Sequence, residues 1–221
     1  MKKNFLKLSA MMIACALIFT SCAKDEDTTK PVITVTGGTT MTTVLNATFV
    51  PPVVTATDDT DGDLTSSVKM TGTVNKDLTG DYVLTYSVAD AAGNTDEKTV
   101  TVHVVNSAAN LAGNYSYINI WGVGTVNDTV FKTDVIAPSS TINNAIVFQE
   151  FGSYSTCPVI ATVTGTTISV ASQTFTVGSP AAPTNFISIG TNTINGTSIT
   201  INYNETVSGT TTICKSVYIK Q

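Results

Sequence analysis

The sequence predicts an all-β protein with two antiparallel domains in succession. Three observations support this fold class. Threonine accounts for 41 of the 221 residues, and Thr, like Val, fits a pleated sheet better than a helix. Polar and apolar residues alternate with a period of two over much of the chain. Turn sequences such as Gly37-Gly38 and Asn195-Gly196 separate the alternating stretches.

Composition and charge exclude several functional classes. All 11 basic residues are Lys, the formal net charge is −5 and the isoelectric point is about 4.6. A chain without Arg at this isoelectric point lacks the basic surface that nucleic-acid binding requires. Phosphoryl-transfer sites that depend on arginine clamps are excluded as well. The low charge and the 42% of hydrophobic residues argue against a disordered chain.

The N-terminus is expected to direct export and anchoring. Three Lys precede the apolar run Leu8–Phe19, which is too short to span a membrane and is typical of a signal peptide. The following Phe19-Thr20-Ser21-Cys22 resembles a bacterial lipobox. This resemblance implies that residues 1–21 are removed and that Cys22 is lipidated. The alternative is an ordinary secretory signal that is cut near Ser21.

Residues 22–30 are expected to form an acidic tether. Lys24-Asp25-Glu26-Asp27, which follows Cys22 after Ala23, resembles the surface-export signal of Bacteroidetes-type lipoproteins. The resemblance implies a lipid-anchored protein on the outer face of the outer membrane. The alternative is a solvated, charged tether of a kind that any lipoprotein can carry.

Cysteine usage agrees with export. Cys15 leaves with the signal peptide and Cys22 is acylated, so Cys157 and Cys214 remain as an even pair. The sequence predicts a disulfide between them, which contributes about 4 kcal/mol in the chain-entropy model. Two Cys and one distant His do not supply the four ligands of a zinc site.

Residues 31–105 are expected to form a small antiparallel sandwich of immunoglobulin (Ig) type. Short alternating strands separated by turns are typical of this architecture. The expected strands are 31–35, 53–57, 82–88 and 100–104. Val100, Val102 and Val104 share one face of the last strand, and His103 lies on the opposite, solvent-facing side.

Three segments of this region resemble the bacterial surface Ig-like family, which is related to hyalin repeats. They are Pro31–Val35, Ala56–Thr65 and Gly80–Asn94. The resemblance implies a spacer and presentation module that is commonly placed before another domain on surface and secreted proteins. It implies no chemistry.

A run of four carboxylates is the candidate metal site. Asp58, Asp59, Asp61 and Asp63 offer clustered oxygen ligands that suit Ca²⁺. The run is not an EF-hand, because the twelfth position falls on Val68 instead of Glu. The alternative is a strand-end turn whose Asp side chains accept local N–H groups. Apart from this possible structural Ca²⁺, no cofactor is expected.

A polar link, residues 106–110, leads to a second β domain over residues 110–221. Eight strands in about 110 residues predict an up-and-down barrel or a second sandwich. The opening Gly113-Asn114-Tyr115 and the closing strand with Tyr218 resemble lipocalin-like C-terminal domains of surface lipoproteins. The expected strands are 114–121, 129–136, 145–151, 159–164, 167–173, 186–189, 198–204 and 213–220.

No catalytic constellation stands out, so the chain is not expected to be an enzyme. His103 is the only His and lies in the spacer domain, so a Ser-His-Asp triad cannot be assembled. The alternative is a glycoside hydrolase in which Glu150 and Glu205, the only Glu residues of the second domain, meet in a barrel mouth.

A binding site is the favoured function. Tyr115, Tyr117, Asn119 and Trp121 share one strand face, which suits sugar stacking with a flanking amide. The alternative is a core face, in which Asn119 needs a buried partner. We therefore expect a surface-anchored, non-catalytic binding or presentation module for an extracellular glycan. The alternative function is a structural or adhesive envelope protein that acts through a surface protein complex.

Overall fold

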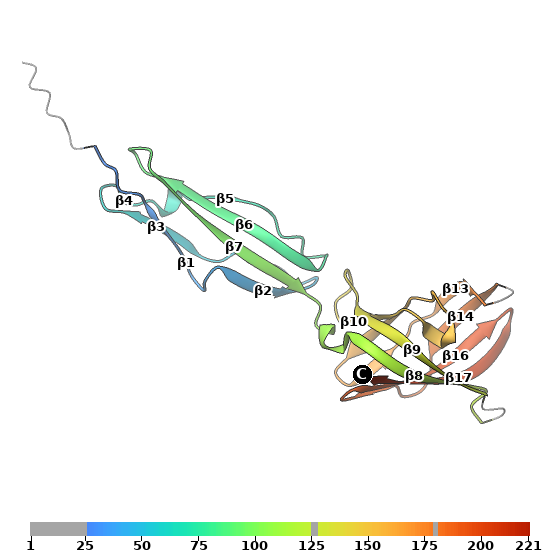
Figure 1. Cartoon of the computed structure of the whole chain (residues 1–221). Helices are drawn as coiled ribbons and strands as arrows, with labels where there is room; N and C mark the ends of the chain where they lie inside the picture. The colour runs from blue at the N-terminus through green and yellow to red at the C-terminus, as the bar shows by residue number, and fades with distance from the viewer. Residues whose placement is uncertain (1–25, 125–127, 179–180) are drawn as a thin grey trace, which may run out of the picture. The chain divides into compact units, whose positions relative to one another are not determined.

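The computed structural model describes residues 26–124, 128–178 and 181–221 (Figure 1). The expected signal peptide, the lipidation site Cys22 and the first part of the tether lie outside these residues. Strands dominate the described chain, together with short 3-10 turns. In this part of the chain, no helix is long and apolar enough to span a membrane.

The N-terminal strands form two sheets, as expected for an Ig-type sandwich. One sheet has the order β1-β3-β4 and the other β2-β7-β6-β5. Strand β2 pairs in parallel with β7, for example Met41 with Val102. The strands are β1 (Val32–Val35), β2 (Thr40–Val44), β3 (Val54–Asp58), β4 (Gly62–Asp63), β5 (Lys69–Thr71), β6 (Gly80–Ala89) and β7 (Thr95–Val105), and the 3-10 turn η1 (Thr65–Ser67) precedes β5.

The four strands expected in this region correspond to β1, β3, β6 and β7. Their alternation is clear because Leu84, Tyr86 and Val88 are buried in β6, and Val100, Val102 and Val104 are buried in β7. Strands β2, β4 and β5 were not expected. None of them has a buried residue, so they lack the apolar periodicity that identifies a strand in a sequence.

The C-terminal region is a closed barrel of eight antiparallel strands. Around the ring the order is β8-β9-β10-β11-β12-β15-β16-β17, and the pairing of β17 with β8 closes it. This settles the choice between barrel and sandwich. The strands are β8 (Gly113–Trp121), β9 (Asp128–Pro138), β10 (Ala145–Phe148), β11 (Val159–Thr164), β12 (Thr167–Ser169), β13 (Gln173–Val177), β14 (Ala182–Ser188), β15 (Thr193–Asn195), β16 (Ser198–Val207) and β17 (Thr210–Lys220).

A hairpin of β13 and β14 interrupts the simple up-and-down order. Strand β16 pairs with β15 through its first residues and with β14 through its last five. The Gln173 side chain takes the place of a missing strand partner, because its Oε1 accepts the N–H of Ile160 (2.9 Å) and its Nε2 donates to the carbonyl of Ile160 (2.6 Å). The strand expected over 167–173 is therefore divided into β12 and β13.

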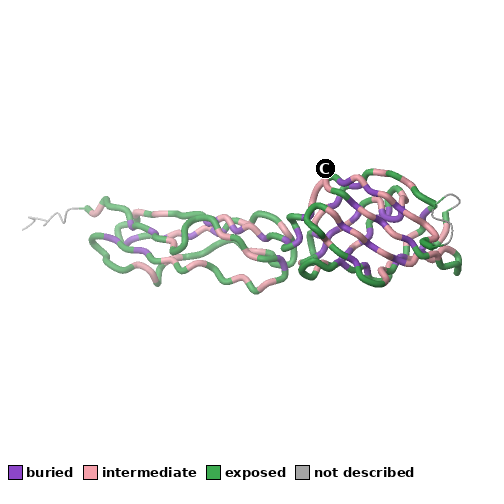
Figure 2. Tube along the Cα trace, turned by 90° about the horizontal axis from the view of Figure 1, so that it is seen from below, coloured by how far each residue is buried: buried purple, intermediate pink, exposed green. Residues whose placement is uncertain are grey.

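The barrel is filled by large aromatic side chains. Buried positions alternate with exposed and intermediate ones along its strands (Figure 2). Tyr218 lies 4.7 Å, between ring centroids, from both Tyr117 and Phe148. Phe151 lies 4.7 Å from Tyr203 in the same way. This interior is a packed core.

The link before the barrel is pinned to it by one side chain. The amide of buried Asn106 donates to the carbonyls of Ser139 (2.7 Å), Ile142 (2.9 Å) and Ala145 (3.0 Å). Its Oδ1 accepts the N–H of Ala108 (2.8 Å). The Asn106 side chain thus fastens the link to the loop between β9 and β10. The link continues into the 3-10 turn η2 (Ala109–Leu111).

The described chain divides into two compact units. The first contains residues 26–34, Val54–Lys69 and Tyr86–Glu97, and the second contains Val35–Val53, Met70–Thr85 and Lys98–Gln221. The domain boundaries predicted from the sequence were 31–105 and 110–221. The unit boundary instead crosses β6 and β7, because these two long strands run through both units.

Candidate functional site

Three of the four residues expected to form an aromatic platform are core residues. Tyr115, Tyr117 and Asn119 are at most 2% exposed. Asn119 is buried with them, and its Oδ1 accepts hydrogen bonds from Tyr203 (2.8 Å) and Ser216 (2.6 Å), whereas its Nδ2 is buried without a hydrogen-bond partner. These three side chains therefore cannot stack on a ligand at the surface.

Trp121, the fourth residue, is partly exposed and is held by Glu205. The indole Nε1 donates to Glu205 Oε2 (2.8 Å), and the Tyr154 hydroxyl donates to Oε1. Glu205 is buried, so both oxygens of this carboxylate are engaged inside the protein. This arrangement suits an anchor for Trp121 better than a free catalytic acid.

The expected disulfide between Cys157 and Cys214 is not found, because both cysteines are free, buried thiols. The Cys214 thiol points to Glu205 Oε2 (3.7 Å) and to the Thr212 carbonyl (3.7 Å). Burial, reinforced by the Glu205 charge, raises the pKa of both thiols to about 12. An even count of cysteines in an exported chain carries no information about the direction of their side chains.

A surface hollow on the barrel arises where β9 continues past the end of β10. Strand β10 pairs with β9 only as far as Phe148 and Ile136. Beyond that point a side chain replaces the backbone ladder, because Asp134 Oδ1 accepts the N–H groups of Gln149 and Glu150, both at 3.0 Å. The two segments therefore part, and the outer surface of β9 lies open beside them.

The hollow has two adjoining parts that share Thr133 and Glu150. One part has a volume of about 440 Å³ and the other about 480 Å³. Phe131 stands at its edge and is 74% exposed, and Val135 is 54% exposed. The lining residues are Asn114, Tyr115, Phe131, Lys132, Thr133, Asp134, Val135, Gln149, Glu150 and Gln221.

Asp134 is the electrostatically unusual residue of the hollow. Burial raises the pKa of its carboxyl to about 6, although backbone N–H donors oppose the shift and the charge of Glu150 adds to it. Its Oδ2 is buried without a hydrogen-bond partner. The carboxylate is therefore ionised at neutral pH at a cost in folding free energy.

The hollow suits a ligand with both apolar and hydroxyl surfaces. An exposed aromatic ring offers a stacking face, and the amide groups of Asn114, Gln149 and Gln221 supply donors and acceptors around it. Sequence reasoning missed Phe131. Phe131, Thr133 and Val135 share one face of the strand. The opposite face carries the charged residues Lys132 and Asp134, and charged residues are typical of a solvent-facing side, so the sequence pattern did not indicate that Phe131 is exposed.

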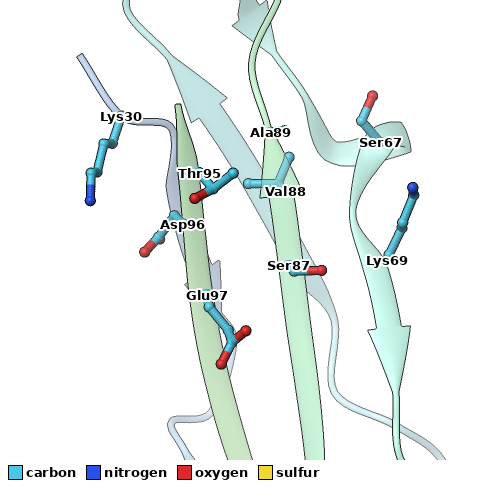
Figure 3. Close-up of a pocket in the computed structure, with 9 residues that line it drawn as sticks. All are labelled: Lys30, Ser67, Lys69, Ser87, Val88, Ala89, Thr95, Asp96 and Glu97. Carbon is cyan, nitrogen blue, oxygen red and sulfur yellow. The ribbon is translucent and has the colours of Figure 1, made fainter. Parts of the chain in front are cut away.

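A separate hollow, of about 680 Å³, lies on the N-terminal strands (Figure 3). Figure 3 shows Asp96 and Glu97 on β7 and Lys69 on β5, with Ser87 on β6 between them. Asp96 Oδ2 accepts the N–H of Ile33 (2.9 Å), so this carboxylate holds β1. Among the described residues no aromatic side chain lines this hollow, which makes it a weaker candidate for sugar stacking.

The four carboxylates expected at a metal site do not act together. Asp61 Oδ2 accepts the N–H of Ala91 (2.7 Å), and Asp63 Oδ1 accepts the N–H of Thr65 (2.9 Å). Hydrogen bonds from Thr65 hold the pKa of Asp63 below its ordinary value. Asp58 and Asp59 lie close together, and they are joined by a residue from outside the run, Asp27.

Comparison with solved structures finds similar chains at low identity. The lipoprotein BT2262 from Bacteroides thetaiotaomicron is 17% identical, with a TM-score of 0.35, over 86% of this chain and 100% of that chain. The structure of CBM51-2 in complex with GlcNAc and INT domains from Clostridium perfringens ZmpB is 16% identical, with a TM-score of 0.30, over 86% of this chain and 44% of that chain. Comparison with curated proteins found no relative of similar sequence.

The N-terminal strands give the specific match. The resemblance seen in the sequence lies over residues 31–105, and β1 to β7 occupy the same part of the chain. A family model, described as the Ig-like domain of bacterial surface proteins, covers residues 33–104. The chain therefore carries a bacterial surface Ig-like domain over these residues.

Proposed function

We propose that this chain is a non-catalytic surface lipoprotein whose barrel binds an extracellular glycan. In this proposal Cys22 carries the lipid anchor in the outer membrane, residues 22–30 are the tether and the Ig-like domain is a spacer. The surface Ig-like domain and the lipobox-like sequence support the location. The glycan assignment depends on the hollow over β9.

The exposure of Phe131 carries the glycan proposal. A phenyl ring that is 74% exposed contributes little of the stabilisation that its burial would give to the fold. Its place with Glu150 in one part of the hollow, next to the part that Gln149 lines, gives it the surroundings of a sugar site, where a ring stacks on the sugar face and polar groups fix the hydroxyls. The glycan-binding residues we propose are therefore Phe131, Gln149 and Glu150, in place of the Tyr115–Trp121 face.

A non-catalytic role agrees with the two Glu residues of the barrel. Trp121 and Tyr154 occupy both oxygens of Glu205, whereas Glu150 lines the outer hollow. A glycosidase needs one free acid and one free base or nucleophile on either side of the same bond. The bonding of Glu205 supports a structural role.

A specific observation keeps a protein partner as the second candidate. Ile213 and Ile219 on β17 are 50% and 47% exposed, so apolar side chains also occur on the outer face among residues that do not line the hollow. Exposed apolar groups on a rigid sheet are common in protein interfaces. In that case the protein is an adhesive or structural component of the envelope.

Affinity gel electrophoresis against polysaccharides of plant, bacterial and host origin tests the proposal. We expect Phe131→Ala to weaken retention more than about tenfold while stability changes by less than about 0.5 kcal/mol, because the ring is exposed. Ile187→Ala is the matched control, since Ile187 is an exposed apolar residue on β14, outside the hollow. If no polysaccharide retards the wild type, or if Phe131→Ala binds normally, the glycan site is rejected.

A further inference from the structure

A second cluster of carboxylates lies where the expected tether meets the N-terminal strands. Asp27, Asp58 and Asp59 each place one carboxylate oxygen within 4.8 Å of the others. Asp58 ends β3 and Asp59 follows it. Asp27 comes from the other side of β1, 31 positions earlier than Asp58. The fold thus brings together acidic groups that the sequence keeps apart.

Two of these carboxylates each have one oxygen that accepts no hydrogen bond. Asp58 is 9% exposed, and its Oδ1 accepts the N–H groups of Thr60 and Asp61, both at 3.0 Å. Asp27 Oδ1 accepts the N–H of Thr29 (2.9 Å). The Oδ2 atoms of Asp27 and Asp58 are both buried without a hydrogen-bond partner, although buried carboxylate oxygens normally have one.

No ion pair involves these three carboxylates within the described residues. The ion pairs found there are Lys76 with Asp77 and His103 with Asp81, and neither involves the cluster. Three neighbouring carboxylates repel one another, and burial of an unpaired one is costly. A bound cation removes both penalties at once.

The segment that carries Asp27 is positioned by a further contact. Asn94 Nδ2 donates to the backbone carbonyl of Asp27 (3.1 Å) and to Asp90 Oδ2 (2.8 Å). The turn after β6 therefore holds the end of the tether near the turn after β3. This contact places Asp27 beside Asp58 without help from its own carboxylate.

We propose that Asp27, Asp58 and Asp59 bind one Ca²⁺ ion, which fastens the tether to the Ig-like domain. Oxygen is the only donor type in the cluster, and it suits Ca²⁺ rather than zinc or copper, which favour imidazole and thiolate. The ligands come from a tether and a turn, and such an irregular set meets the flexible geometry of Ca²⁺ more easily than the strict octahedron of Mg²⁺. Water and backbone carbonyls complete the shell.

Calorimetric titration of the full chain, after chelator treatment, tests the site with Ca²⁺ and, separately, Mg²⁺. We expect one Ca²⁺ per chain with a Kd of about 0.1–1 mM, the range of extracellular modules, and a rise in Tm of a few degrees at about ten times the Kd. No heat and no Tm shift up to about 10 mM Ca²⁺, or Mg²⁺ binding as tight as Ca²⁺, overturns the proposal.

Isosteric variants separate this cluster from the rest of the acidic run. Asp58→Asn keeps the oxygen that accepts the turn N–H groups but removes the charge, so we expect Ca²⁺ affinity to fall more than about tenfold. Asp27→Asn lies in the tether and leaves the sandwich intact, so its loss of affinity does not reflect unfolding. Asp63→Asn is the matched control, and an equal loss in this variant contradicts the assignment.

Proteolysis gives a readout that only the tether contact changes. A Glu-specific protease cleaves after Glu26, next to Asp27. Saturating Ca²⁺ is expected to slow this cleavage about tenfold, because the bound state must open first, and Asp27→Asn is expected to abolish the protection. Cleavage at the same rate with Ca²⁺ and with chelator excludes Asp27 from the site.

Discussion

Replacement of Asp134 by Asn is predicted to stabilise the barrel increasingly as the pH rises from 4 to 7. The folded-state pKa of Asp134 is about 6, above the ordinary 3.8, chiefly because of burial. The folded protein therefore holds this proton at pH values where the unfolded chain has released it. The contribution of the protonated carboxyl to stability is complete below pH 3.8 and is lost as the pH rises through about 6.

The size of the effect follows from the two pKa values. A pKa difference of this size corresponds to at most about 3 kcal/mol, and part of this is already lost at pH 4, just above the ordinary pKa of 3.8. Asn removes the titration but keeps an oxygen that can accept the N–H groups of Gln149 and Glu150. The stability difference between Asp134→Asn and the wild type should therefore grow by about 1–2 kcal/mol between pH 4 and pH 7.

Urea unfolding at several pH values, followed by tryptophan fluorescence, measures this difference. Trp121 is the only Trp of the chain and lies in the barrel, so the signal reports the correct domain. Asp128→Asn is the matched control, because Asp128 is an exposed acid on the same strand. A stability difference that is constant from pH 4 to pH 7, or that Asp128→Asn reproduces, refutes the burial argument.

Three further predictions concern the barrel. Asn106→Ala should lower the free energy of unfolding by about 1–3 kcal/mol, because buried carbonyls lose their donor. The control Asn110→Ala, in the same link, should change this free energy by less than about 0.5 kcal/mol. Equal effects of the two variants in urea unfolding would show that the amide contacts contribute nothing. Cys157 and Cys214 should not react with a thiol reagent in the native protein, whereas both should react in denaturant without reductant. Peptide mass spectrometry measures this labelling, and failure to label them in denaturant would support the disulfide instead. Trp121→Phe should cost about 1–3 kcal/mol, since a buried carboxylate oxygen loses its N–H donor, and calorimetry showing an unchanged Tm would contradict this.

The repeating parts of the fold were predictable from the sequence. Period-two alternation identified β6, β7 and most barrel strands because each of them has one buried apolar face. The short strands β2 and β5 and the division at residues 170–172 were not predictable. Their pairing depends on neighbours distant in the chain, such as the Gln173 amide that replaces a strand next to Ile160.

The candidate sites were harder to predict. Alternation along a strand shows which side chains share a face, but it does not show whether that face is buried or exposed. Tyr115 and Tyr117 were placed on the correct shared face, and that face is the core. The acidic run correctly included Asp58 and Asp59, but Asp27 enters the cluster only through the fold. Local turn geometry directs Asp61 and Asp63 to backbone N–H groups instead.

Strand β9 shows why charge alone misleads in a barrel. Lys132 and Asp134 share parity with buried Ile136, so their side chains leave the outer face. Each is retained because it replaces a missing strand contact: Lys132 donates to the Ser153 carbonyl (2.7 Å), and Asp134 accepts two N–H groups. The outer face is consequently left to Phe131, Thr133 and Val135. The strand parity that turns Lys132 and Asp134 away from the outer face thus leaves that face to the aromatic ring on which the proposed glycan site depends.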